Sequence, residues 1–449
     1  MEKDELRAAG SLAAVFSVRL LGLFMVYPVF ASYARHLAGS TPYRIGLALG
    51  IYGLTQGLLQ IPFGLLSDRI GRKVMVIAGL LVFGAGSAIA ALSSSMDGVI
   101  LGRALQGGGA VGSVALAWVA DLTSEESRTK AMALLGISIG ASFMVALITG
   151  PVLAGVIGVE GIFWLMALLA AIGIGIVVFI VPSPRTLRVH SDAETVPTLL
   201  GSIVRNRELL RLDFGIFTLH AILTASFLVV PSLLEARLGV SGPSQWQVYL
   251  PILLVSVVLM VPAIIAAEKY RCMKAVFVGT VSVIAVSQWM LAFGQSGRVI
   301  VIAALTLFFG AFNIMEASLP SLITKVAPPR AKGTATGVYS SSQFLGIFAG
   351  GVAGGWLQQS LGNHAVFECA GALALLWLLL AASMRRPSYL VTRLMRIGPA
   401  LDAQQLAAAL GRVPGVAEAV VVSEEHLAYL KVDAKVFDQA LAQSLTGVD

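Results

Sequence analysis

The chain has 449 residues, of which 57% are hydrophobic and 12% charged, and its formal net charge is +7. Soluble globular proteins are about 45–50% apolar and about 25% charged, so this composition excludes a typical soluble protein and predicts a membrane protein with several spans. The positive charge fits the excess of Lys and Arg that such proteins carry in their cytoplasmic loops.

The N-terminal charges are followed directly by a long apolar run without a small-residue cleavage site, which predicts an uncleaved first span. The two cysteines, Cys272 and Cys369, form no metal-ligand spacing. The sequence contains no GxxxxGKS/T phosphate-binding loop and no evident nucleophile–base pair. We therefore expect neither an ATP-driven pump nor an enzyme, and no cofactor or metal.

Runs of about 20 apolar residues, long enough to cross a bilayer, fall into two sets of six. The first set covers residues 12–34, 46–66, 74–93, 98–120, 131–155 and 161–181. The second set covers residues 213–236, 246–267, 275–294, 298–320, 332–356 and 363–384. These runs predict an all-α membrane fold of twelve transmembrane helices in two six-helix halves, residues 1–182 and 212–386, joined by a cytoplasmic linker at 183–211.

Basic residues predict the orientation. With a cytoplasmic N-terminus, twenty Lys and Arg near span ends fall on the cytoplasmic side and four on the other, so the positive-inside rule places both termini in the cytoplasm. The twenty are Lys3, Arg7, Arg69, Arg72, Lys73, Arg128, Lys130, Arg185, Arg188, Arg205, Arg207, Arg211, Lys269, Arg271, Lys274, Lys325, Arg330, Lys332, Arg385 and Arg386. The four are Arg35, Arg44, Arg237 and Arg298.

The tail, residues 387–449, has a different pattern from the rest of the chain. Strand-like runs at 390–397, 416–422 and 427–432 are combined with helical stretches at 402–410 and 434–445, and residues 424–426 form a turn. This β-α-β-β-α order predicts a small cytosolic α+β domain of ferredoxin-like type without its last strand. Its five bases and seven acids argue against nucleic-acid binding. We expect either a regulatory or stabilising dock on the cytoplasmic face or an inert appendage.

The segment Gly64–Lys73, GLLSDRIGRK, holds one acid, three bases and two glycines between two apolar runs. It resembles the G-x-x-x-D-R-x-G-R-K/R signature of the major facilitator superfamily between spans two and three. The segment 101–107, LGRALQG, and the glycines around Gly150–Gly155 resemble two further motifs of that family, the latter associated with antiporters. The resemblance covers residues 12–385, and the tail resembles that of the YajR subgroup of bacterial inner-membrane transporters.

Asp68 and Arg72 are four residues apart, so they are neighbours if the helix continues. The resemblance implies that Asp68 contacts the start of span eleven near Gly333 and that Arg72 pairs with Asp121. These contacts would close the cytoplasmic side in the outward-open state. The alternative is a charge cluster that only fixes topology, but the glycines favour a gate because close backbone approach requires residues without a Cβ. The predicted cytoplasmic gate comprises Gly64, Asp68, Arg69, Gly71, Arg72 and Asp121.

Three ionisable residues inside predicted spans are candidates for proton coupling: Glu316, His220 and Arg19. Loss of water around Glu316 favours its protonated form, so this carboxyl group could bind and release protons near neutral pH. Asn313 lies one turn earlier, so both side chains are expected on one helix face. The alternatives are a hydrogen-bonded packing residue at Glu316, a satisfied structural donor at His220 and a structural ion pair at Arg19. Asp213 is expected at the membrane interface.

Pro151 removes a helix hydrogen bond, so Gly150, Pro151 and Gly155 predict a kink and a close helix contact in span five. The substrate cavity of a secondary transporter lies near the membrane midplane between the halves. Polar or aromatic side chains that could line it are Tyr27, Tyr52, Gln56, Gln60, Arg103, Asn313, Tyr339 and Gln343. Each of these could instead be a packing residue.

The leading hypothesis is proton-coupled export, or antiport, of small molecules by alternating access. We expect a monomer in the lipid bilayer of the bacterial inner membrane, with a small-molecule substrate and protons as partners and no nucleic acid. One alternative is proton-linked nutrient uptake. Another is a transporter-like membrane sensor that signals through the C-terminal domain. The sequence does not give the substrate.

Overall fold

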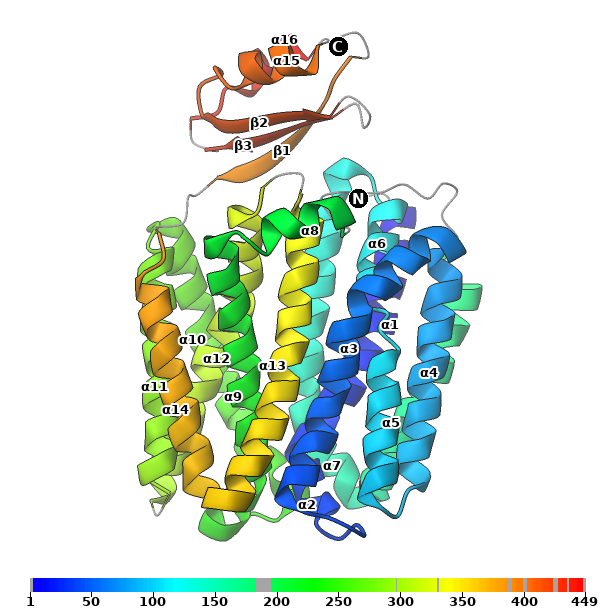
Figure 1. Cartoon of the computed structure of the whole chain (residues 1–449), viewed down its shortest axis with the longest axis vertical. Coiled ribbons are helices and arrows are strands. Elements are labelled where there is room, and N and C mark those ends of the chain that lie inside the picture. Colours follow the sequence, from blue (N-terminus) through cyan, green and yellow to red (C-terminus); the bar gives the residue numbers. More distant parts are fainter. Residues whose placement is uncertain are drawn as a thin grey trace.

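The computed structural model describes residues 3–182, 195–295, 297–328, 331–385, 390–398, 402–422, 427–433 and 436–446. Residues 183–194 of the predicted linker and the predicted turn at 424–426 lie outside the described residues. Figure 1 shows a bundle of long helices with a small domain of strands and short helices at one end.

The helices form two groups that lie side by side in Figure 1. The first group comprises α1 (Lys3–Met25), α2 (Tyr27–Ala34), α3 (Pro42–Ile70), α4 (Arg72–Leu92), α5 (Met96–Gly108), α6 (Gly112–Leu122) and α7 (Glu125–Phe179). The second comprises α9 (Arg207–Leu238), α10 (Trp246–Lys269), α11 (Met273–Phe293), α12 (Arg298–Val326), α13 (Lys332–Leu361) and α14 (Asn363–Ala382). The short 3-10 helix η1 (Gly242–Ser244) precedes α10.

Ten helices among the described residues are long and apolar enough to cross a membrane. The 30-residue helix α13 is not among them, because it is rich in Gly, Ser, Thr and Gln. The predicted spans at 131–155 and 161–181 lie on a single element, α7, which is interrupted at Gly158 (φ 72°, ψ 174°). Glycine tolerates this conformation, so the chain can reverse there without a separate loop.

Two of the predicted spans are divided. The span predicted at 12–34 consists of α1 and α2, with Pro28 near the start of α2. Proline fixes the backbone and lacks an N–H donor, so it favours a new helix start. The span predicted at 98–120 consists of α5 and α6, separated by residues 109–111 at the end of a run of three glycines.

The two groups of helices meet at α3 and α13, which lie side by side in the centre of Figure 1. A Cβ atom on Gly46 would lie 2.1 Å from the Gly351 carbonyl oxygen, and one on Gly53 would lie 2.3 Å from the Phe344 carbonyl oxygen. The two backbones therefore touch, which only glycine permits at these positions.

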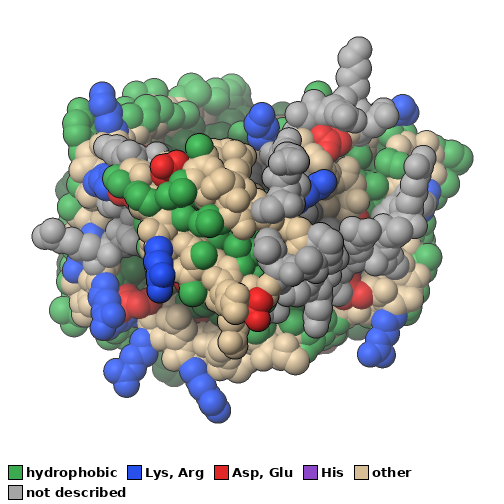
Figure 2. All heavy atoms as spheres, turned by 90° about the horizontal axis from the view of Figure 1, so that it is seen from above, with side chains coloured by type: hydrophobic (Ala, Val, Ile, Leu, Met, Phe, Trp, Pro, Cys, Tyr) green, Lys and Arg blue, Asp and Glu red, His purple; other side chains and the backbone are tan. Residues whose placement is uncertain are grey.

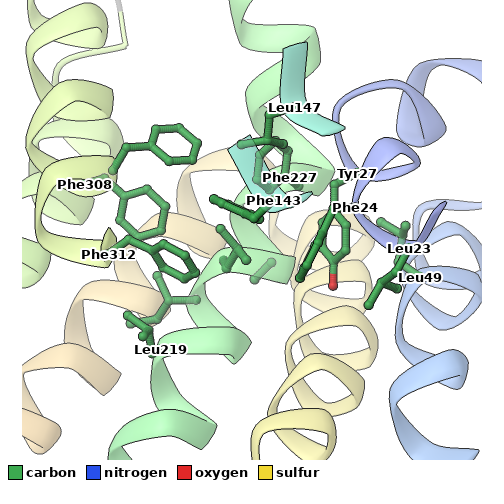
Figure 3. Packing of buried hydrophobic residues seen from close by; sticks show 14 of the residues in the cluster. Leu23, Phe24, Tyr27, Leu49, Phe143, Leu147, Leu219, Phe227, Phe308 and Phe312 are labelled. Atoms are coloured by element: carbon green, nitrogen blue, oxygen red, sulfur yellow. The ribbon is translucent and has the colours of Figure 1, made fainter. Parts of the chain in front are cut away.

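Aromatic side chains form a second contact between the groups (Figure 3). Phe143 of α7 lies between Phe24 of α1, at 5.0 Å between ring centroids, and Phe312 of α12, at 5.2 Å. Tyr27 of α2 packs edge-on against Phe227 of α9 at 5.5 Å. The middle of the bundle is therefore closed by apolar rings from both groups.

The predicted linker is shorter than expected. The helix α8 (Pro197–Ile203) occupies part of it, and α9 begins at Arg207 rather than near residue 213. Asn206 caps α9, because its Oδ1 accepts hydrogen bonds from the backbone N–H groups of Glu208 and Leu209. The backbone N–H of Val196 donates to Thr334 Oγ1 at 2.9 Å, so the end of the linker rests on α13.

The C-terminal domain contains β1 (Val391–Arg396), α15 (Ala403–Leu410), β2 (Val416–Val422), β3 (Leu427–Val432) and α16 (Gln439–Leu445). The strands form an antiparallel sheet in the order β1-β3-β2, and both helices cover the face turned away from the bundle. This agrees with the predicted β-α-β-β-α order, although the last helix begins at Gln439, after the Asp438 cap, and not at residue 434. Leu406, Leu410, Leu430 and Ala442 form its core.

The N-terminus and the C-terminal domain lie at the same end of the bundle. Figure 2, viewed from this end, shows Lys and Arg side chains around its rim. We refer to it as the cytoplasmic end, because it carries the excess of basic residues.

Candidate gate and central polar residues

The turn between α3 and α4 holds most of the predicted gate residues. Gly71 joins the two helices with φ 103°, a conformation that residues with a side chain rarely adopt. Among the described residues no atom lies within 4 Å of a Cβ placed on Gly71, so its backbone conformation is the reason for glycine in this arrangement of the helices. Gly64 does lie in a tight contact, since a Cβ there would be 3.1 Å from Ser113 Oγ.

Arg72 is the centre of a buried polar cluster at this turn. Its Nε donates to Asp121 Oδ2 at 2.9 Å, its Nη1 donates to Ser67 Oγ at 2.6 Å, and it also pairs with Asp68. The side chains of Arg72 and Asp121 are almost completely buried. The structure thus brings the acids of α3 and α6 onto one guanidinium, whereas Arg69 is exposed and lies outside the cluster.

A small open cavity of about 30 Å³ adjoins this cluster. Asp68 and Arg72 line it from the first group of helices, and Gly333 and Thr336 line it from α13. Asp68 and the start of α13 therefore face the same open space. The cavity also reaches Gln60, farther into the bundle on α3.

Glu316 of α12 lies beside His220 of α9 and Gln343 of α13. Gln343 Nε2 donates to Glu316 Oε1 at 3.4 Å and lies 2.9 Å from His220 Nε2, while Glu316 Oε2 is 3.8 Å from the same His220 nitrogen. The Tyr339 hydroxyl is buried one turn before Gln343. Three helices of the second group thus place a carboxyl, an imidazole and an amide together inside the bundle.

Arg19 of α1 and Arg103 of α5 both lie near the ring of Tyr52. Their guanidinium carbons are 5.9 and 5.0 Å from the centre of the Tyr52 ring. Arg19 donates to Gln56, which in turn donates to Gln60 Oε1 at 3.1 Å. Both arginines are buried, with exposed fractions of 1% and 0%.

The remaining cavity candidates contact different neighbours. Tyr27 and Thr224 share a hydrogen bond of 3.2 Å between their hydroxyl groups, which joins α2 to α9. Asn313 donates to Ser256 Oγ of α10 at 2.6 Å, whereas Glu316 contacts α9 and α13. Asn313 and Glu316 therefore face different helices, although they are only three residues apart.

Comparison with known proteins explains this arrangement. Residues 12–351 and 244–407 match the model of the Major Facilitator Superfamily, and residues 395–442 match that of the YajR YAM domain. The chain belongs to the major facilitator superfamily. It is 43% identical over 450 residues to the inner membrane transport protein YajR of Escherichia coli, covering 99% of both chains. It is thus a multi-pass inner-membrane transporter rather than an enzyme, and the predicted resemblance is confirmed.

Two more distant relatives agree with this membership. The chain is 32% identical over 180 residues to the class B tetracycline resistance protein of Escherichia coli, which covers 39% of this chain and 44% of that protein. A bacterial homologue of the human lysosomal transporter Spinster, solved in an inward-facing conformation, superposes with a TM-score of 0.65 and 14% identity, covering 85% of this chain and 96% of that one. The latter likeness concerns the fold.

The segment Gly150–Gly155 lies where α7 approaches α1 and η1. A Cβ on Gly150 would be 2.5 Å from the Met25 carbonyl oxygen, and one on Gly155 would be 2.8 Å from Pro243 Cβ. Pro151 lies within the helix between them. Both glycines therefore permit close contacts, the first within its own group of helices and the second with the other group.

Asp213 was expected at the membrane interface. It is only 5% exposed, and neither carboxylate oxygen has a hydrogen-bond partner among the described residues. It lies inside α9 rather than at its start, because α9 begins almost two turns earlier, at Arg207. The Asn206 cap followed by Glu208 in the first turn is the sequence signal that would have placed Asp213 inside the helix. Within the described part of the chain, no group of three or more His, Cys, Asp or Glu could hold a metal ion.

Proposed function

We propose that this member of the superfamily exports small molecules in exchange for protons, by alternating access. In this proposal twelve transmembrane segments form two halves. The ten helices counted above supply ten of them, the division of α7 at Gly158 adds one, and α13 adds the last. The substrate would bind between the halves near the midplane.

The observation that carries the proposal is the position of Glu316. Its Oε2 atom is buried without a hydrogen-bond partner among the described residues. The side chain that could supply an opposite charge is His220, whose Nε2 lies 3.8 Å from Oε2. An ionised carboxylate in such a place is costly, so proton uptake offsets its burial. Glu316, His220 and Gln343 come from three helices, so a movement of these helices relative to one another would change the proton affinity of the Glu316 carboxyl group.

The buried contact between Arg72 and Asp121 supports a cytoplasmic gate in this proposal. It fixes the α3–α4 turn to the end of α6, while Asp68 and Gly333 line the same small cavity from the two groups of helices. Closure of that cavity would bring Asp68 to the N-terminal end of α13, where exposed N–H groups favour an anion. The gate would then be closed at the cytoplasmic end and the transporter open outward.

Export rather than uptake is supported by the likeness to the tetracycline resistance protein and by Gly150, Pro151 and Gly155. The test uses inside-out membrane vesicles whose lumen is acidified by respiration, with an acridine dye as the pH reporter. Solutes from a compound library are added to vesicles with the wild-type protein or Glu316→Gln at equal expression. We expect at least one solute to collapse the pH gradient with the wild type and not with the variant.

Nutrient uptake gives the opposite result. Solutes would then enter right-side-out vesicles when the outside is acidic, and would leave the pH gradient of inside-out vesicles unchanged. That pattern would contradict export. A transporter-like sensor predicts solute binding without flux in either orientation, with wild-type vesicles behaving like those with Glu316→Gln.

A further inference from the structure

The two buried arginines of the first group of helices, Arg19 and Arg103, have no acidic partner in the described part of the chain. The six spans predicted between residues 12 and 181 contain both of these arginines and not a single Asp or Glu. The acids of this half lie outside these spans. Asp121, for example, lies at the end of α6 and pairs with Arg72. Two positive charges therefore share the interior of one half without an opposite charge.

Their hydrogen bonds go only to neutral groups. Arg103 donates from Nε to the Ala48 carbonyl oxygen at 3.3 Å and from Nη1 to Gln106 Oε1 at 2.8 Å, and Arg19 donates to Gln56. Arg19 Nε, Arg103 Nη2 and the Tyr52 hydroxyl are buried and have no hydrogen-bond partner among the described residues. A buried donor without a partner loses its hydration without compensation.

The two arginines with unpartnered nitrogens both lie beside Tyr52. Both guanidinium groups lie within about 6 Å of its ring, 5.9 Å for Arg19 and 5.0 Å for Arg103. If these side chains only held α1, α3 and α5 together, neutral hydrogen-bonding groups would be sufficient. Two charged forks with spare N–H groups and no carboxylate are instead the chemistry that binds a planar carboxylate or a phosphate.

A hydrogen-bonded chain joins this place to the cytoplasmic cavity. Arg19 donates to Gln56 and Gln56 donates to Gln60, and Gln60 lines the open cavity beside Asp68. A solute that enters from the cytoplasmic end would therefore meet polar groups along α3 before it reaches the arginines. The two interior acids, Asp213 and Glu316, belong to the other half, so the arginines and the carboxyl groups of the interior lie in different halves.

We propose that Arg19 and Arg103 form the binding site for an anionic group of the transported solute, a carboxylate or a phosphate on an organic molecule. This inference rests on the proposed transport function and names its substrate class. The bound anion neutralises the two guanidinium groups and accepts the hydrogen bonds that Arg19 Nε and Arg103 Nη2 lack. Protons are carried on the opposite half, at Glu316, so the solute and the coupling ion do not compete for one group.

The test measures the thermal stability of the full-length protein in detergent with four small probes. Benzoate and phenyl phosphate carry the anionic group, benzamide is a neutral analogue and benzylamine is a cation. We expect at least one of the two anions to raise the unfolding temperature of the wild type in a concentration-dependent manner, and benzamide and benzylamine not to. Arg19→Gln and Arg103→Gln should each weaken the anion's apparent affinity about tenfold or more, because each removes a charge-assisted hydrogen bond. Arg35→Gln removes a positive charge from the opposite end of the bundle and should leave the affinity unchanged.

Arg19→Lys and Arg103→Lys guard against misfolding of the Gln variants, because they keep the charge and lose only the planar fork. They should weaken anion binding without abolishing it. The assignment is overturned if neither anion stabilises the wild type, if benzamide or benzylamine does so equally well, or if the anions stabilise the arginine variants as they stabilise the wild type. Glu316→Gln should retain anion binding, so a failure of proton coupling and a failure of this site give different patterns.

Discussion

The α3–α4 turn of the first half and the α10–α11 turn of the second half join corresponding helices at the same end of the molecule. In both, one residue has a positive φ: Gly71 at 103° and Arg271 at 52°, the latter being the one non-glycine residue with positive φ in the described part of the chain. The first turn directs its central base, Arg72, into its own half. The second turn has a side chain where the first has none, and that side chain binds another domain.

Arg271 contacts Asp433 of the C-terminal domain, with three nitrogen–oxygen distances of 3.0 to 3.3 Å. Nearby, Lys431 Nζ donates to the carbonyl oxygens of Lys325 and Val326 at 3.1 and 3.5 Å. These carbonyls belong to the last turn of α12, where a cation is favoured by the helix dipole. Lys325 in turn pairs with Glu268 of α10.

The α3–α4 and α10–α11 turns therefore occupy corresponding places in the two halves but have different roles. The glycine turn leaves open space beside α13, so we propose that it moves relative to the second half when the gate opens and closes. The arginine turn anchors the C-terminal domain on α10, α11 and α12, so we propose that this domain moves together with the second half.

Arg72→Ala should have the largest effect, because it leaves the buried Asp121 carboxylate without its guanidinium. Removing one partner of a buried ion pair destabilises a protein by about 3–5 kcal/mol. Arg271→Ala is the matched change in the second turn, where both partners are partly exposed, and should cost less than about 1 kcal/mol. Thermal unfolding and flux in vesicles would compare the two, and equal losses would contradict the distinction between the turns.

Gly71→Ala should have an intermediate effect, because it forces a side chain into the conformation at φ 103°. The strain should be about 1–2 kcal/mol. The control is Gly140→Ala, since Gly140 lies within α7 with no atom within 4 Å of a Cβ and should tolerate alanine. Thermal unfolding measures both variants. If the two glycines respond alike, the backbone of the first turn is not the reason for glycine there.

Asp433→Asn should have the smallest effect on stability and should act on the tail alone. It weakens the contact with Arg271, which is partly exposed on both sides. We expect faster hydrogen exchange in β3 with nearly unchanged flux. The comparison variant is Asp438→Asn, which changes the N-cap of α16 and leaves the contact between Asp433 and Arg271 intact. A large loss of flux in Asp433→Asn alone would show that the tail takes part in transport.

Much of the fold follows from the sequence, because apolar length and basic residues report directly on membrane crossing. The family signature in Gly64–Lys73 predicted the pairing of Arg72 with Asp121, which the structure brings together at 2.9 Å. The tail was also predictable, since its alternation of strands and helices is local. The break between the spans at 131–155 and 161–181 was also predicted, but not that it falls at the single residue Gly158 without a separate loop.

The central polar residues were harder to predict because their partners come from distant helices. The sequence analysis placed Arg19 among the candidates for proton coupling and Arg103 among the candidates for the substrate cavity. Only the packing of the helices brings both against Tyr52. Similarly, Asn313 and Glu316 share a helix turn but contact different neighbours. The burial of Asp213 depended on where α9 begins, a boundary that hydropathy alone places poorly.

In the proposed cycle the first turn moves relative to the second half, whereas the C-terminal domain does not. Spin labels on a variant with Cys272 and Cys369 replaced by Ser would measure this by pulsed electron–electron distance measurements. One label pair joins Arg69 to Ala275, across the halves, and the other joins Ala275 to Ala417, on α11 and the tail. Between acidic and alkaline buffer, and between wild type and Glu316→Gln, we predict that the first distance shifts and the second stays constant. A constant first distance, or a second that shifts with it, would contradict the account.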